Sequence, residues 1–111
     1  MAASLARSRK LDVLRLLDRR RRAVAGAKAA IEALRHLGVT AEFVGSLADE
    51  RFNQSSDIDL LVTDCPRRLK YAIESVVEDC VPGFSFDVLY LDELPPYRAA
   101  RYLETRHGDR S

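Results

Sequence analysis

The hydrophobic residues near the start of the chain recur at steps of three and four. Residues 5–37 are mostly strong helix formers, and their apolar positions include Leu11, Leu14, Leu17, Val24, Ala27, Ile31 and Leu34. This spacing predicts one long helix or two shorter ones. A break, if there is one, is expected at the charged run 18–22 or at Gly26, because glycine weakens a helix interior by about 1 kcal/mol relative to alanine. Gly38 is expected to cap the carboxyl end of the helix.

Three short stretches downstream have the pattern of β-strands. Residues 39–44 are a mainly apolar run, whereas residues 57–62 and 84–91 alternate between two faces. A helical pattern that begins with a proline occupies residues 66–80, and a further short helix is expected at 95–106. Strands that alternate with helices predict a small α/β (α+β) fold. We expect a mixed sheet of three strands or slightly more, with helices packed on it and a long N-terminal helix.

The length of the chain fits one domain. At 111 residues, it can bury about two-thirds of the surface that its unfolded form exposes. We expect a single domain over residues 1–111, with a helical N-terminal segment at 1–37 and a core at 39–106. The 18 Lys and Arg residues nearly balance the 17 Asp and Glu residues, so the total charge gives no general attraction to nucleic acid.

The two cysteines and the hydropathy of the chain bear on its location. Cys65 and Cys80 form no C-x-x-C pair and have no metal-ligand spacing to other Cys or His residues, so reduced structural thiols are expected. No stretch approaches the roughly 18 apolar residues of a membrane span. We expect neither export nor membrane insertion, and therefore a cytoplasmic protein.

The second predicted strand carries two carboxylates. Asp57 and Asp59 are two residues apart, which places them on one face of a strand with their Cβ atoms about 6.6 Å apart. Like charges repel, so the pair needs a cation or free solvation to stay ionised. Asp87 on the third strand is a candidate for a third ligand. Carboxylates, water and phosphate oxygens form the octahedral shell that Mg²⁺ prefers, and two such ions can promote phosphoryl transfer.

A Gly-Ser pair follows the first predicted strand. Gly45 allows the backbone to approach a phosphate closely, and Ser46 offers a hydroxyl and an amide at the start of a helical turn. Alone, Gly-Ser is typical of an ordinary turn, and Asp-x-Asp is typical of a solvated strand entrance. Together, and followed by a third strand that carries Asp87, they favour a metal-nucleotide site.

These residues resemble a known family. Gly45-Ser46, followed after ten residues by Asp57-Ile58-Asp59, resembles the signature of the minimal nucleotidyltransferases (MNT), the smallest members of the DNA polymerase beta-like superfamily. Phe86-Asp87-Val88 is similar to the third strand of that family. The resemblance spans about residues 39–106. It implies the small nucleotidyltransferase fold and transfer of a nucleotide from ATP or another nucleoside triphosphate, with Mg²⁺, as two ions, for the cofactor.

The resemblance also implies roles for individual residues. Gly45 and Ser46 would hold the β- and γ-phosphates, and Asp57 and Asp59 would bind Mg²⁺. Asp87 would complete the metal site and act on the acceptor hydroxyl. In this family the acceptor can be a HEPN ribonuclease toxin, and the resemblance implies an antitoxin that transfers AMP to such a partner.

One departure from the family pattern lies within the Gly-Ser segment. The family usually continues Gly-Ser-x-Ala-Arg-Gly, whereas this chain places Asp49 and Glu50 at the last two positions. Acids beside a triphosphate weaken nucleotide binding unless they point away or a cation compensates for them. We therefore include Arg51 among the expected phosphate-binding residues.

Two alternatives to this enzyme stay open. A nucleotidyltransferase-fold module with little or no activity would neutralise its partner by contact, and its amphipathic N-terminal helix would also suit pairing with a second copy. An enzyme that adds nucleotides to the 3′ end of a tRNA is the other. The run Arg19–Arg22 is more typical of a solvated helix face than of an RNA contact.

Two further patterns near the carboxyl end carry less weight. Arg101 and His107 match the Arg-x5-His spacing of HEPN nucleases. We reject that interpretation because such a nuclease needs an all-helical bundle. The scattered tyrosines, Tyr102 among them, are more typical of packing than of base stacking.

Overall fold

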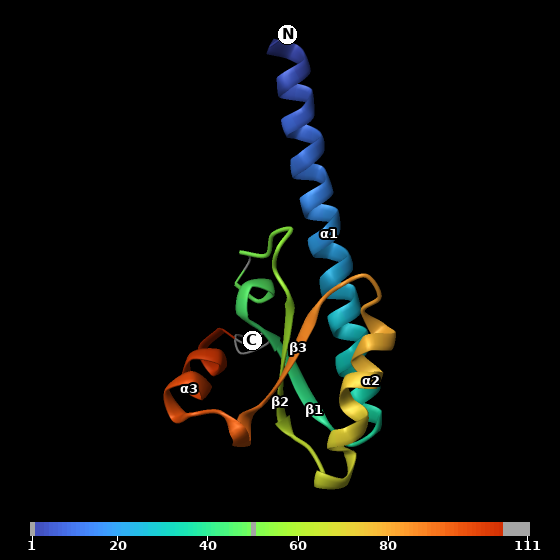
Figure 1. The fold of residues 1–111 in the computed structure, drawn as a ribbon, viewed down its shortest axis with the longest axis vertical. Helices are drawn as coiled ribbons and strands as arrows, with labels where there is room; N and C mark the ends of the chain where they lie inside the picture. Colours follow the sequence, from blue (N-terminus) through green and yellow to red (C-terminus); the bar gives the residue numbers. More distant parts are fainter. Residues whose placement is uncertain (1, 50, 106–111) are drawn as a thin grey trace.

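The chain folds into a mixed α/β structure with one very long helix (Figure 1). The computed structural model describes residues 2–49 and 51–105. Its helices and strands are α1 (Ala2–His36), β1 (Thr40–Val44), β2 (Ile58–Asp64), α2 (Lys70–Cys80), β3 (Phe86–Tyr90) and α3 (Pro96–Thr105). Three short 3₁₀ turns lie between them: η1 (Gly45–Leu47), η2 (Arg67–Leu69) and η3 (Leu91–Glu93).

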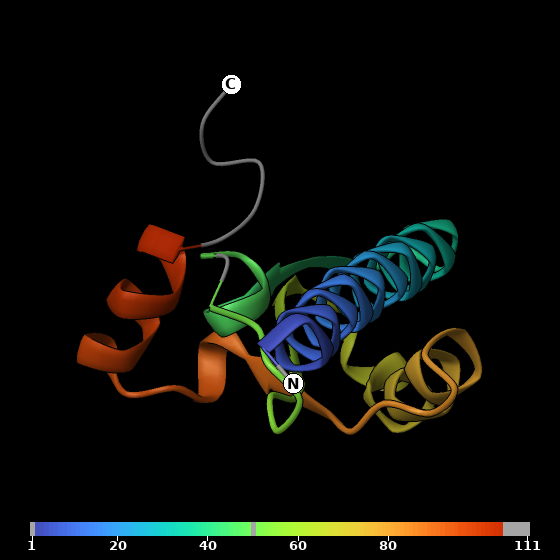
Figure 2. The same cartoon turned by 90° about the horizontal axis from the view of Figure 1, so that it is seen from above.

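The three strands form one mixed sheet in the order β1-β2-β3. Strand β1 pairs antiparallel to β2, and β3 pairs parallel to β2. A parallel pair needs a crossover connection, and α2 provides it. Helices α1 and α2 cover one face of the sheet, and α3 lies on the other side (Figures 1 and 2). The predicted class, a three-stranded mixed sheet with packed helices and a long N-terminal helix, is confirmed at this level.

Helix α1 is continuous, so the possible break at the charged run or at Gly26 does not occur. Gly26 allows close packing instead, because a Cβ at this position would lie 2.9 Å from Cγ1 of Val81 and 3.0 Å from the carbonyl oxygen of Cys80. Gly38 caps the helix as predicted. Its φ is +89°, and its amide donates a hydrogen bond to the carbonyl of Arg35 at 3.0 Å.

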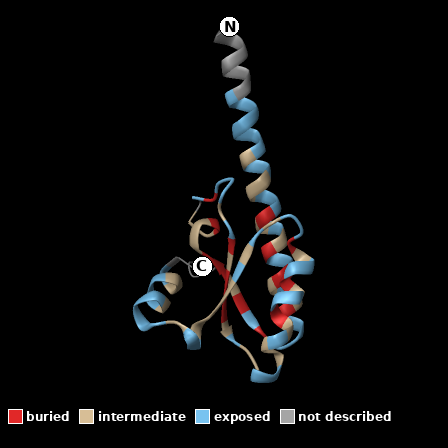
Figure 3. Cartoon of the chain, viewed as in Figure 1, coloured by how far each residue is buried: buried red, intermediate tan, exposed pale blue. Residues whose placement is uncertain are grey.

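The core lies between α1, α2 and one face of the sheet (Figure 3). Small alanines on α1 allow the helix to lie close to the sheet. The buried core residues include Ala23, Ala27, Ala30 and Leu34 of α1, Ile58, Leu60 and Val62 of β2, and Ile73 and Val77 of α2. Side chains alternate along a strand, so Asp59 and Leu61 point toward the other face, where α3 lies.

Several predicted boundaries move by a few residues. The second strand begins at Ile58 rather than Asp57 and extends to Asp64, which pairs with Thr40 across a bulge. The third strand begins at Phe86, because residues 84 and 85 still follow the turn closed by the bond from the Phe84 amide to the Val81 carbonyl. The 3₁₀ turn η1 at 45–47 takes the place of the short helix or turn expected at 47–51.

The helix expected from residue 66 begins as the 3₁₀ turn η2, and α2 itself starts at Lys70 and ends at Cys80. Pro66 has an extended backbone, which keeps it out of the helix. The final helix begins at Pro96 and ends at Thr105, close to the expected range, and its expected last residue, Arg106, lies outside the described residues.

The amino-terminal half of α1 extends away from the rest of the molecule (Figure 1). We call residues 9–18 the arm. Most of its large apolar side chains are solvent-exposed, with exposed fractions of 45% for Leu11, 50% for Leu14 and 56% for Leu17. Leu16 is half-buried. Among the described residues, no helix is both long and apolar enough to cross a membrane.

Candidate active site

Strand register brings the predicted site residues to one end of the sheet. Val44 of β1 pairs with Asp59 of β2, and Asp59 pairs in turn with Asp87 of β3. Gly45 follows Val44 directly, and Asp57 lies just before β2. The glycine and the three carboxylates, which are far apart in the sequence, therefore lie around one cross-section of the sheet.

Gly45 lies directly against the carboxylate of Asp59. Its φ is +69°, a left-handed conformation that favours glycine. A Cβ at this position would lie 2.6 Å from Oδ2 of Asp59. The backbone conformation therefore favours glycine here, and a larger residue would also have to displace the Asp59 carboxylate.

Asp59 is the half-buried member of the carboxylate group, whereas Asp57 and Asp87 are exposed. Burial raises the pKa of Asp59 to about 6, and the negative charges of Asp87 and Asp57 add to the rise. A cation bound beside Asp59 would oppose this rise in pKa, because its positive charge favours the ionised carboxylate. These hard oxygen donors are of the type that Mg²⁺ prefers.

The carboxylates are not gathered into a closed metal site. In the described part of the chain, no group of three or more Asp, Glu, His or Cys side chains is arranged to hold a metal ion. Asp57 and Asp87 affect Asp59 through their charge, and both are solvent-exposed. The donor set fits Mg²⁺ in its chemistry, and water and phosphate oxygens would have to complete the coordination shell.

Ser46 lies in the single turn η1 rather than at the start of a longer helix. Its side chain is half-buried, and its carbonyl accepts a hydrogen bond from the amide of Arg51 at 3.0 Å. The carbonyl of Gly45 accepts bonds from the amides of Ala48 and Asp49, each at 3.1 Å. These bonds close the segment into a compact turn beside Asp59.

A cavity of about 330 Å³ lies between this turn and α3. Its walls combine residues predicted from the sequence with residues of α3 that were not. The residues that line it are Gly45, Asp49, Arg51 and Asp59 on one side and Arg98, Arg101 and Tyr102 on the other. Three arginines thus line the same cavity as Asp59, the carboxylate whose pKa is raised.

The sequence pattern does not predict the contribution of α3. It assigns no role to Arg98, it includes Arg101 only in the rejected nuclease motif, and it favours packing for Tyr102. The available signal was the spacing of 98, 101 and 102, because residues three and four apart share one face of a helix. His107, the other half of the rejected motif, lies outside the described residues.

Arg51 is paired with the acid that departs from the family pattern. Its guanidinium donates to Oδ2 of Asp49 from Nη2 at 2.6 Å and from Nε at 3.0 Å, and its amide donates to Oδ1 at 3.2 Å. This pairing lowers the pKa of Asp49 below its usual range. Arg51 therefore compensates for the charge of Asp49, while Glu50 lies outside the described residues.

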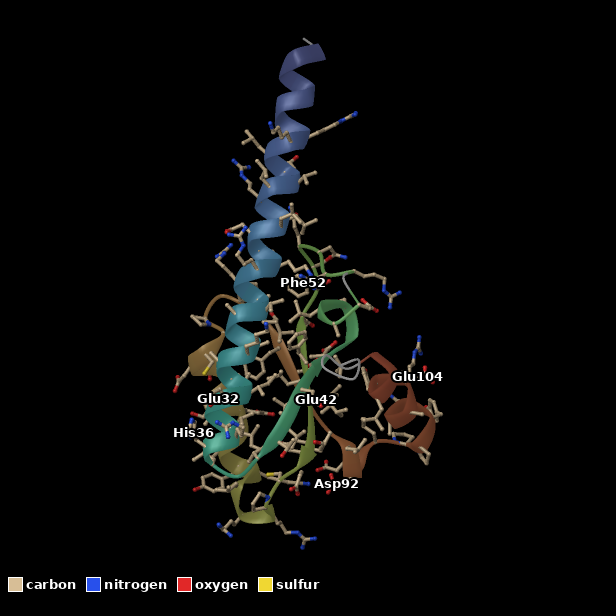
Figure 4. All side chains as sticks on the ribbon, turned by 180° about the vertical axis from the view of Figure 1, so that it is seen from behind. Glu32, His36, Glu42, Phe52, Asp92 and Glu104 are labelled. Atoms are coloured by element: carbon tan, nitrogen blue, oxygen red, sulfur yellow. The ribbon has the colours of Figure 1, made fainter. Side chains whose placement is uncertain are left out.

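The loop that carries Asp49 and Arg51 is attached to α1 by two arginines. The guanidinium of Arg19 lies 4.7 Å from the ring centre of Phe84 and 5.6 Å from that of Phe52. Arg20 donates a hydrogen bond to the carbonyl of Leu47 at 3.2 Å. Figure 4 shows Phe52 close to α1. The contacts to Phe52 and Leu47 place the loop against the helix, and Phe84, which lies just before β3, packs on the same guanidinium.

The interpretation of the run Arg19–Arg22 as a solvated helix face is therefore wrong for its first half. Arg19 and Arg20 are half-buried, because α1 passes the site loop at this point, whereas Arg21 and Arg22 are exposed. Arg22 pairs with Asp18 one turn earlier, at 3.1 Å.

Comparison of the chain with protein-family models, with curated proteins and with solved structures finds no match.

Proposed function

We propose that this chain is a Mg²⁺-dependent nucleotidyltransferase with the small nucleotidyltransferase fold of the MNT family. The observation that carries the proposal is the paired register of Asp59 and Asp87, with Gly45 packed against Asp59. This register and this contact bring together the Gly-Ser turn, the strand that carries Asp-x-Asp, and the strand that carries Asp87. The proposed substrate is ATP or another nucleoside triphosphate.

In the proposed reaction, an acceptor hydroxyl attacks the α-phosphorus of the nucleotide. The bond from that phosphorus to the bridging oxygen breaks, and pyrophosphate leaves. Asp57 and Asp59 would hold Mg²⁺, which supplies positive charge toward the phosphates when bound. Asp87 would take the proton of the acceptor hydroxyl, because it is exposed at the same cross-section of the sheet.

The proposed acceptor is a partner protein of the HEPN toxin type in the cytoplasm, with this chain as the antitoxin. The resemblance of the Gly-Ser and Asp-x-Asp segments to the MNT family supports this part of the proposal. The exposed arm of α1 offers a surface for such a partner.

The proposal is tested by co-expression of the chain with the product of the adjacent gene, followed by intact-mass spectrometry of that product. We expect an adduct of nucleotide mass that disappears in the Asp57→Ala/Asp59→Ala double variant. Asp64→Ala is the matched control, because Asp64 is an exposed acid at the other end of β2. Equal adduct levels in all three proteins would contradict the proposal, and labelled nucleotide found in RNA instead would indicate the tRNA-type reaction.

A second candidate function is neutralisation of the partner by contact alone. The exposed leucines of the arm favour it, because such side chains typically mark interaction surfaces when they are grouped. A Leu14→Gln/Leu17→Gln variant that loses the partner, together with an Asp57→Ala/Asp59→Ala variant that still neutralises it, would support this function over catalysis. Light scattering of the free chain would show whether the arm instead pairs two copies.

A further inference from the structure

Helix α3 presents a basic surface toward the candidate active site. Arg98, Arg101 and Tyr102 line the same cavity as Gly45 and Asp59. The cavity volume, about 330 Å³, is near the lower end of the range of small-molecule sites, about 300 to 1,000 Å³. The cavity is therefore large enough to place a small anionic ligand beside the arginines of α3.

The two sides of the cavity differ in how their arginines are engaged. Arg51 donates three hydrogen bonds to the Asp49 carboxylate, so its charge is largely compensated within the turn. In contrast, within residues 2–49 and 51–105 the guanidinium of Arg101 has neither an ion pair nor a hydrogen bond, although Arg101 lines the cavity. Among the described residues, the positive charge of this cavity that has no acidic partner is thus on α3.

Arg98 is held in place by a neighbour on the same helix face. Its Nη2 donates to the hydroxyl of Tyr102 at 3.3 Å, and its guanidinium lies 5.8 Å from the centre of the Tyr102 ring. A neutral partner of this kind orients a guanidinium without cancelling its charge. Such orientation reduces the entropy that the side chain loses when it binds a ligand.

We propose that Arg98 and Arg101 form the principal binding site for the phosphate chain of the substrate. They would supply the positive charge that the loop after Ser46 does not offer to phosphates, because Arg51 in that loop is paired with Asp49. Guanidinium groups suit this ligand class, because they bind phosphate oxygens through two parallel hydrogen bonds. The assignment of a nucleotide as the complete ligand rests on the proposed function, whereas the assignment of a polyphosphate site does not.

The test is calorimetric titration with sodium tripolyphosphate in metal-free buffer that contains a chelator. We expect binding by the wild-type chain, and we expect Arg98→Ala and Arg101→Ala each to weaken it by about tenfold or more. Arg67→Ala and Arg68→Ala are matched controls, because these arginines are exposed on η2 outside the cavity lining. They should change the affinity by less than about twofold.

A second variant tests whether the pairing of Arg51 with Asp49 is the reason that phosphate binding depends on Arg98 and Arg101. Asp49→Asn removes the charge that engages Arg51, so a third cation becomes available to the ligand. We expect tripolyphosphate to bind several-fold more tightly to this variant, and the effect of Arg101→Ala to become smaller in the same background.

The outcomes separate this inference from the proposed function. No binding of tripolyphosphate by the wild-type chain, or binding that the α3 variants leave unchanged, overturns the inference even if nucleotide transfer is observed. Binding that depends on Arg98 and Arg101, in a chain that transfers no nucleotide, upholds the inference while the proposed function fails. Circular dichroism of each variant confirms that a loss of binding is not a loss of fold.

Discussion

Gly45 and Asp59 are in contact across the β1–β2 pair, with no space for a side chain on residue 45. A Cβ there would lie 2.6 Å from Asp59 Oδ2. We expect Gly45→Ala to lower the free energy of unfolding by about 2–3 kcal/mol, from a positive φ and from overpacking. Urea denaturation measures the change.

Gly38→Ala is the matched control for this prediction, because Gly38 also has a positive φ, +89°, but a Cβ there would meet no atom within 4 Å. It should show only the conformational part, about 1 kcal/mol. In an Asp59→Ala background the cost of Gly45→Ala should fall to the same level. An unchanged cost in that background would show that the contact is not the cause.

Asp59 is expected to make stability depend on pH. Its pKa rises to about 6 in the folded chain, whereas the unfolded value is near 4. Between these values the folded chain binds more protons than the unfolded chain, so its free energy of unfolding falls as the pH rises. Asp59→Asn should remove this fall in stability, because asparagine does not ionise.

After allowance for solvent screening of a half-exposed group, we expect Asp59→Asn to stabilise the chain by on the order of 1 kcal/mol at pH 7. At pH 3.5 or below, where both side chains are neutral, the two proteins should be nearly equal in stability. Denaturation curves at the two pH values test this prediction. A stabilisation that is independent of pH would refute the electrostatic explanation.

The proposed function predicts that Mg²⁺ offsets the repulsion of Asp57 and Asp87 on Asp59 and stabilises the folded chain. A cation that binds only the folded chain raises its stability, by about 2.7 kcal/mol at a concentration 100 times the dissociation constant. We expect Mg²⁺ to raise the melting temperature of the wild-type chain at pH 7. It should have little effect on Asp57→Asn/Asp59→Asn, and Asp64→Asn is the control for general salt effects.

The basic run of α1 supplies a matched pair of variants. Arg19 stacks on Phe52 and Phe84, so Arg19→Ala should lower the free energy of unfolding by about 1–2 kcal/mol. Arg21 is exposed, and Arg21→Ala should stay within about 0.5 kcal/mol of the wild-type chain. Thermal denaturation compares the two. Equal effects would mean that the aromatic contacts do not stabilise the loop.

The sequence predicts the order and type of the elements because their signals are local. The spacing of apolar residues in α1, the alternation along β2 and the glycine after the first helix all act within a few residues. The sequence does not reveal that Gly26 is a contact point, since that depends on where the end of α2 lies. A glycine inside a helix has the same local cost in either case.

The sequence predicts the part of the candidate site that lies on neighbouring strands. It does not predict the part that α3 contributes, because that part depends on how the helix packs. Asp59 and Asp87 are expected on neighbouring strands, and the register places them side by side. The arginines of α3 reach the cavity only through the position of that helix relative to β1. Nor does the sequence distinguish Arg19 from Arg21, because burial by the site loop is a long-range property.

The paired positions Val44, Asp59 and Asp87 form a single rung of the sheet, and this has a consequence for how the chain can vary. A slip of one residue in either pairing would turn a carboxylate toward the opposite face, because side chains alternate along a strand. One residue inserted within β2 would therefore dismantle the site, whereas residues inserted into the exposed loop at 53–55 would leave the rung intact. Length variation can be absorbed between the strands but not within them.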